Sequence, residues 1–186
     1  MKFQLLSLFS LLLSSATAAP SPPKPKAFDI MALRSASPIH FSQVSAARSG
    51  LFLGLPQQNA TCKGGKSSEY ATFSVENEEL VLYSCEGVKQ KVFVDRSGMG
   101  QGIVGYITGD APLPRYGELK GWKVDASQNL WFKDVGLIAC PNSIDGSWRI
   151  WLGLGLQTPG GNQGCLGFTA RTLENAKPVS CRYTQG

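Results

Sequence analysis

The apolar residues of this chain occur in short runs that alternate with polar residues or are rich in β-branched side chains. No segment shows a sustained apolar period of about 3.6 residues, as an amphipathic helix would, and only SAARSG (45–50) is compatible with one helical turn. Turn-forming sequences such as GDAP, NSIDG and TPGGN separate the runs. The runs are FDIMAL, PIHFSQV, GLFLG, ATFSV, ELVLY, KVFV, IVGYI, GWKV, NLWF, GLIA, SWRIWL, GFTAR and VSCRY. This pattern predicts an all-β fold.

A weak internal repeat indicates how these strands are arranged. Residues 73–83 align with 122–132 without a gap, and residues 92–107 align with 137–152. The aromatic starts of the units are Phe28, Phe73, Trp122 and Phe168, which lie about 46 residues apart. Three such units would close as a single compact antiparallel β-barrel, β-trefoil-like, with the last strand beside the first. The alternative is a two-sheet β-sandwich, because many antiparallel folds give a similar spacing.

The two ends of the chain predict export. Lys2 is followed by an apolar run and then by small residues, which is the order found in a secretory signal peptide at 1–18. Cleavage one residue later ranks second, because it would place a proline directly after the cut. The apolar run is too short for a membrane span, which needs roughly 20 residues. A proline-rich linker at 19–27 precedes one β domain at 28–186, and the polar end lacks a lipid-anchor signal.

Five cysteines lie far apart in the sequence, at Cys62, Cys85, Cys140, Cys165 and Cys181. In an exported chain such cysteines predict disulfides rather than metal ligands. There is no CxxC pair and only one histidine, so we expect no metal site and no cofactor. Cys140 and Cys165 flank a hairpin-like segment and are the favoured pair. Cys62 with Cys181 would tie an early loop to the last strand, which leaves Cys85 unpaired.

Asn59 begins the sequon Asn-Ala-Thr in a polar loop, so we expect it to be glycosylated and exposed. The formal net charge is +5, but the basic residues are scattered and no run of four occurs. A nucleic-acid-binding protein would concentrate them on one face. We therefore expect no nucleic-acid partner, no membrane partner and a monomer.

Catalytic machinery has little support in the sequence. His40 is the only histidine and has no nucleophile motif near it. Asp125, Asp134 and Asp145 are candidates for a glycosidase carboxylate pair, but they mostly occupy turn contexts, where aspartate bonds to the local backbone. We therefore expect no enzyme activity and no catalytic residue.

Two groups of residues are candidates for glycan contact. The glycine-rich segment DRSGMGQG carries Asp95 and Arg96, which could bind a polar ligand; the alternative is an ordinary tight turn. Trp131, Trp148 and Trp151 could stack on sugar rings, although tryptophan is also the expected core filler of a small barrel. In SWRIWL the two tryptophans point to opposite faces, so one of them belongs to the core and the other is exposed or covered.

Several long segments in fixed order resemble one known family. The segments are VFVDRSGMGQGIVGY, GWKV with NLWF, LIACPNSIDGSWRIW, GCLGFTAR and PVSCRYTQ. Together with the sequon and four of the cysteines they resemble the fungal PhiA cell-wall proteins over residues 28–185. Cys85 looks like a departure from that pattern, which agrees with its being unpaired. More distantly, the segment from GWKV to Cys165 is similar to the C-terminal cysteine module of Pir-type yeast wall proteins, but their glutamine-rich repeats are absent.

The resemblance implies a secreted wall protein without catalysis. Proteins of this kind are needed for phialide and conidium formation and protect against stress, and the partner would be a wall polysaccharide, namely glucan, chitin or mannan. The alternative is a soluble carbohydrate-binding or effector-like module that recognises such polysaccharides, and a glycan-active enzyme is the third hypothesis.

Overall fold

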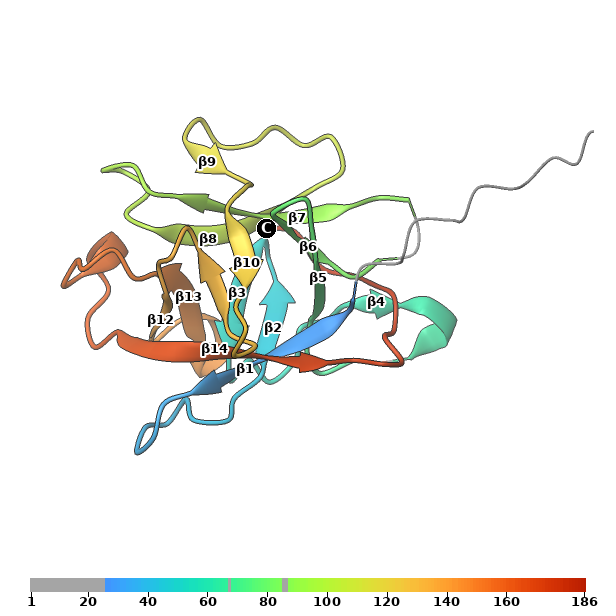
Figure 1. Cartoon of the computed structure of the whole chain (residues 1–186), viewed down its shortest axis with the longest axis horizontal. Helices are drawn as coiled ribbons and strands as arrows, with labels where there is room; N and C mark the ends of the chain where they lie inside the picture. The colour runs from blue at the N-terminus through green and yellow to red at the C-terminus, as the bar shows by residue number, and fades with distance from the viewer. Residues whose placement is uncertain (1–25, 67, 85–86) are drawn as a thin grey trace, which may run out of the picture.

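The structure, a computed structural model, describes residues 26–66, 68–84 and 87–186 (Figure 1). Most of the segments predicted as signal peptide and linker, and also Cys85, lie outside these residues. The strands are β1 (Phe28–Leu33), β2 (Val44–Ala47), β3 (Gly50–Leu53), β4 (Thr61–Cys62), β5 (Thr72–Glu76), β6 (Glu79–Leu82), β7 (Gln90–Asp95), β8 (Ile103–Thr108), β9 (Gly117–Glu118), β10 (Trp122–Val124), β11 (Leu130–Phe132), β12 (Leu137–Cys140), β13 (Trp148–Leu152), β14 (Leu166–Glu174) and β15 (Cys181–Arg182). Three single-turn 3-10 helices, at Lys63–Gly65, Ile144–Gly146 and Pro159–Gly161, are the only helical elements of the described chain. The prediction of an all-β fold is confirmed.

Eleven of the described strands form one antiparallel sheet, in the order β2-β3-β8-β13-β12-β14-β1-β5-β6-β7-β9. Strand β7 pairs with both β6 and β8. The pairings therefore form a closed circuit, which runs in the order β8, β13, β12, β14, β1, β5, β6, β7 and back to β8. Two smaller sheets pair β10 with β11 and β15 with β4.

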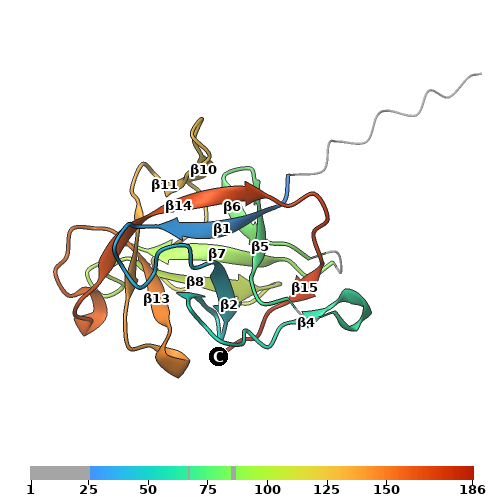
Figure 2. The ribbon, with the colours of Figure 1, turned by 90° about the horizontal axis from the view of Figure 1, so that it is seen from below.

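The first and the last long strands lie side by side, as the repeat predicted (Figure 2). Six residue pairs join β1 to β14, from Phe28 opposite Glu174 to Leu33 opposite Thr169. Alternate residues of β14 are buried, which is the period of a strand with one face on the core. This pairing brings residues separated by more than a hundred positions into one ladder.

In each pair of segments that the internal repeat aligns, both segments correspond to hairpins. Residues 73–83 contain the β5–β6 hairpin and residues 122–132 contain the β10–β11 hairpin. Likewise, 92–107 holds β7–β8 and 137–152 holds β12–β13. The copies differ in their neighbours, because β5–β6 belongs to the large sheet while β10–β11 forms a separate two-stranded sheet.

Two local predictions were wrong. The segment 45–50 is not a helical turn but a tight hairpin between β2 and β3, with positive φ at both central residues, Arg48 and Ser49. Such a turn matches the twist of the flanking strands. The run PIHFSQV is mostly turn, because Phe41 has a φ of 64° and the strand begins only at Val44.

The main core is built of aliphatic and large aromatic side chains, and Phe52 belongs to a separate smaller cluster. The largest buried side chains of the main core include Trp122, Tyr106, Tyr183, Phe73 and Phe132. The rings of Trp122 and Phe132 meet edge to face with centroids 5.0 Å apart. Burial of one such side chain stabilises the fold by about 1.5–3 kcal/mol relative to an exposed one. In the part of the chain that the structure describes, no helix is long and apolar enough to cross a membrane.

Candidate binding surface

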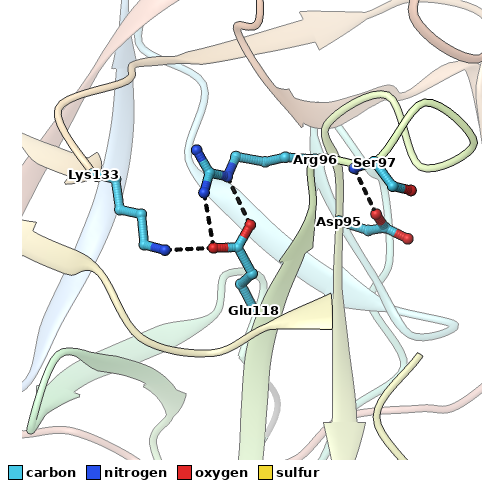
Figure 3. A network of polar contacts seen from close by, with 5 residues as sticks. All are labelled: Asp95, Arg96, Ser97, Glu118 and Lys133. Atoms are coloured by element: carbon cyan, nitrogen blue, oxygen red, sulfur yellow. Dashed lines mark hydrogen bonds and ion pairs between the residues drawn. The ribbon is translucent and has the colours of Figure 1, made fainter. Parts of the chain in front are cut away.

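Asp95 is the last residue of β7 and its side chain organises the turn that follows (Figure 3). Its Oδ1 accepts a hydrogen bond from the Ser97 amide at 2.9 Å, and the Ser97 hydroxyl accepts one from the Gly100 amide at 3.1 Å. A Cβ atom on Gly100 would lie 2.2 Å from the Asp95 Cγ, so only glycine fits there. The Asp95 carboxylate is therefore a structural part of the turn.

Arg96 is held in an ionic network at the surface (Figure 3). Its Nε and Nη2 donate hydrogen bonds to the two carboxylate oxygens of Glu118, at 2.7 and 2.9 Å. The Lys133 ammonium donates to the same carboxylate. The hydrogen bond from Arg96 is the main reason that the pKa of Glu118 is lowered to about 2, and the same contact raises the pKa of Arg96. The network joins the ends of β7, β9 and β11, and sequence reasoning missed both Glu118 and Lys133.

A hollow of about 550 Å³ lies beside this network and is lined by Arg96, Ser97, Tyr116, Gly117 and Glu118. The Tyr116 side chain is 52% exposed. The guanidinium of Arg115 lies over its ring at 5.2 Å from the centroid. A polar ligand in this hollow would therefore meet an exposed ring and an arginine that is already bound to a carboxylate.

The tryptophans do not form an exposed platform. Trp131 is half-buried, and its indole N–H donates to the Asp125 Oδ2 at 2.8 Å. Trp148 is also half-buried and packs against the main core. Trp151 is only 7% exposed, and Gly160 covers it so closely that a Cβ there would lie 2.5 Å from the indole. As the alternation of SWRIWL indicated, the two tryptophans of β13 face different surroundings.

The exposed aromatic residues are ones that sequence reasoning missed. Phe41 is 63% exposed and Tyr70 is 41% exposed, and both line a hollow of about 370 Å³. The sequence contained a signal for the exposure of each of these two residues. His40 and Phe41 are adjacent rings in one run, so a strand could not bury both on the same face. Tyr70 is a large aromatic at the end of a polar loop.

The four cysteines that the structure describes form two bridges. Cys62 is bonded to Cys181 and Cys140 is bonded to Cys165, with Cα atoms 3.9 and 4.1 Å apart. These are the two pairs that the sequence analysis favoured. Asn59 is exposed, with a φ of 52°, in the loop that leads into β4. Asn59 is thus at the surface, as attachment of an oligosaccharide would require.

The three carboxylates considered for a glycosidase pair lie in local contacts and turns. Asp125 has a lowered pKa, mainly because it accepts a hydrogen bond from the Asn129 amide and also one from Trp131. Asp134 forms an ion pair with Lys123, and Asp145 lies in a turn with a φ of 51°. A general acid requires a raised pKa, whereas the pKa values of Asp125 and Glu118 are both lowered. Among the described residues no group of His, Cys, Asp and Glu could hold a metal ion.

Comparisons with known proteins agree on one family. The model of a family described as PhiA-like secreted protein matches residues 28–184. A cell wall protein phiA of Aspergillus fumigatus is 45% identical over 172 residues, which is 92% of each chain. The protein of the same name from Emericella nidulans is 44% identical over 99% of this chain and 100% of its own length, and that from Arthroderma benhamiae is 42% identical over 97% and 100%. No solved structure matches this chain.

Proposed function

The chain belongs to the family of PhiA-like secreted proteins, and from that premise we propose that it is a non-enzymatic wall protein required for asexual sporulation. Its place is outside the cell, in the wall. The observation that carries the proposal is the extent of the family match, which covers residues 28–184 and so the whole described β domain. Within this role we propose that it serves phialide and conidium formation and protects the spore-forming cell under stress.

We propose the domain organisation that the sequence predicts. Residues 1–18 act as a signal peptide, 19–27 as a linker and 28–186 as one disulfide-bonded domain. The described strands begin at Phe28, which supports the boundary. The two bridges and the large sheet give a rigid body, which suits a component that stays in place in a polysaccharide network.

We also infer that the large sheet closes as a single barrel. The support is the circuit of pairings, in which β7 contacts both β6 and β8. The two equated pairs of hairpins support a trefoil-like origin of that barrel, and a two-sheet sandwich is the alternative.

Deletion of the gene tests the developmental role. The expected result is fewer conidia and abnormal phialides at normal hyphal growth, with recovery on reintroduction of the intact gene. Separation of washed walls from the culture medium tests the location of the protein during sporulation. Normal conidiation in the deletion strain would contradict the proposed developmental role.

A second candidate function is a soluble carbohydrate-binding or effector-like module. The exposed rings of Phe41, Tyr70 and Tyr116 favour it, because sugars stack on such rings. Glucan, chitin and mannan are the wall polymers to test. Under this alternative the protein accumulates in the medium and binds one polysaccharide, whereas a wall component stays with the washed walls. We expect a glycosylated monomer in both cases, which gel filtration with light scattering can check.

A further inference from the structure

Two exposed aromatic rings lie across one groove on the surface that surrounds the start of β2. The groove has a volume of about 370 Å³, within the roughly 300–1,000 Å³ range of small-molecule sites. Phe41 lies three residues before Val44, the first residue of β2, and Tyr70 precedes Ala71, whose amide donates to the Val44 carbonyl at 2.8 Å. Both ring-bearing segments are therefore fixed to the same strand end.

The chain holds Phe41 exposed at the cost of backbone strain. Its φ of 64° lies in the left-handed region, where a bulky residue is rare and strained. Its amide donates to the Ala32 carbonyl at 2.9 Å, and the Ala32 amide donates to the Ser42 carbonyl at 2.9 Å. The His40 ring stacks on the Phe41 ring with centroids 3.8 Å apart. Strain that surrounding contacts maintain is typical of functional positions, and here it presents a ring to solvent.

Tyr70 is fixed by a buried side chain. Gln58 is 1% exposed, and its amide nitrogen donates to the carbonyl oxygens of Ser68 at 2.6 Å and Tyr70 at 2.9 Å. The Gln58 carbonyl oxygen accepts from the Ala46 amide of β2 at 3.2 Å. One glutamine thus ties the segment that carries Tyr70 to the same strand that follows Phe41. The backbone that carries each ring is thus set in place before any ligand arrives, which lowers the ordering cost of binding.

The polar lining of the groove suits a neutral sugar chain. Ser42, Gln43 and Glu69 supply a hydroxyl, an amide and a carboxylate. No lysine or arginine occurs among the described residues that line it, so it lacks the cation that a phosphorylated mannan would need. In a β-linked glucan every hydroxyl of the ring is equatorial and the axial C–H bonds form apolar faces. Such a ring can stack on an aromatic face while its hydroxyls donate to the carboxylate and the amide.

We propose that the groove between Phe41 and Tyr70 is a binding site for a β-linked glucan chain of the wall. The inference rests on the proposed wall function and names its partner. Chitin carries an acetamide in place of one hydroxyl, so an amide N–H that bears a bulky acetyl group replaces one of the O–H donors that could meet Glu69. Mannan carries an axial hydroxyl on the ring, which interrupts the apolar face.

Affinity electrophoresis in gels that contain soluble β-glucan, glycol chitin or mannan tests the proposal. The variants are Phe41→Gly, which removes the ring and suits the positive φ, and Tyr70→Ala. Leu156→Ala is the control, because Leu156 is a large apolar residue that is 47% exposed and does not line the groove. We expect β-glucan to retard the native protein, each groove variant to bind at least tenfold more weakly, and the control to bind as the native protein does. Thermal melting confirms that each variant is folded.

Three results would overturn the proposal. The first is β-glucan binding that the groove variants leave unchanged, and the second is preferential retardation by chitin or mannan. The third is binding seen only after Asn59→Gln, which would mean that the chain's own N-glycan occupies the groove. A parallel assay on washed walls distinguishes failure of the groove proposal from failure of the proposed wall function. A native protein that the walls do not retain contradicts the wall role, whereas retention of native and variant proteins alike contradicts the groove alone.

Discussion

Removal of the Cys62–Cys181 bridge is expected to destabilise the domain more than removal of Cys140–Cys165. The first bridge joins two two-residue strands, β4 and β15, across a sequence separation of 119 residues, whereas the second spans 25. A disulfide stabilises mainly by restricting the unfolded chain, and the restriction grows with the logarithm of the loop length.

The two magnitudes follow from the loop lengths. For a separation of 119 residues the chain-entropy relation gives about 4.9 kcal/mol, and for 25 residues it gives about 3.5 kcal/mol. The short loop lies within the long one, so each bridge contributes about 0.2 kcal/mol less when the other is intact, and this reduction is the same for both. The expected difference in the free energy of unfolding is therefore about 1.4 kcal/mol. Cavities left by alanine act in the same direction, because Cys62 and Cys181 are both buried while Cys165 is half-buried.

The assay is equilibrium unfolding in guanidinium chloride, followed by tryptophan fluorescence without reductant. The double variants are Cys62→Ala with Cys181→Ala, and Cys140→Ala with Cys165→Ala. Both are made in a Cys85→Ser background, which prevents thiol exchange. Linear extrapolation gives the free energy of unfolding of each protein. Equal losses, or a larger loss from the short bridge, would refute the argument from loop length.

Three further outcomes are expected. Glu118→Gln should lower the free energy of unfolding by no more than about 1 kcal/mol at pH 7, because the ion pairs are exposed to solvent. The pKa of Glu118 is about 2 in the folded protein against an ordinary 4.5. The difference in stability between variant and native protein should therefore be complete above pH 4.5 and vanish as the pH falls through about 2. A gap that is constant with pH would contradict this. Gly100→Ala should lower the free energy of unfolding by about 1–3 kcal/mol through its clash with Asp95. Gly98→Ala is the control and should leave the melting temperature unchanged, because no atom lies within 4 Å of the added Cβ. Equal effects of the two substitutions would contradict the account of the turn. Asn59→Gln should increase the mobility of the secreted protein on a denaturing gel, as enzymatic deglycosylation of the native protein should, and unchanged mobility would rule out the predicted glycan.

The all-β class could be predicted because the period of the apolar residues is a local property. The hairpins could be located for the same reason, since turn residues separate adjacent runs. The error at 38–44 has a physical cause: alternation in PIHFSQV resembles a strand, but the turn is set by backbone hydrogen bonds to Ala32, which sequence patterns do not reveal. The partner of Arg96 was missed for a related reason, because Glu118 reaches Arg96, and Lys133 reaches Glu118, only through the packing of β9 and β11.

The candidate binding residues show where residue type alone misleads. Tryptophan is the most conspicuous sugar-stacking residue, yet Trp122 and Trp151 are buried. Burial of their large apolar area stabilises the fold, and this stabilisation would be lost if the rings were exposed. A ring that meets a ligand must instead stay in water before binding, and the chain must hold it there against the hydrophobic effect. At Phe41 the backbone does so through a left-handed conformation, and at Tyr70 a buried glutamine does so through two carbonyl contacts. The exposed rings that neighbouring contacts hold in place are therefore better candidates for recognition than the more numerous rings in the core.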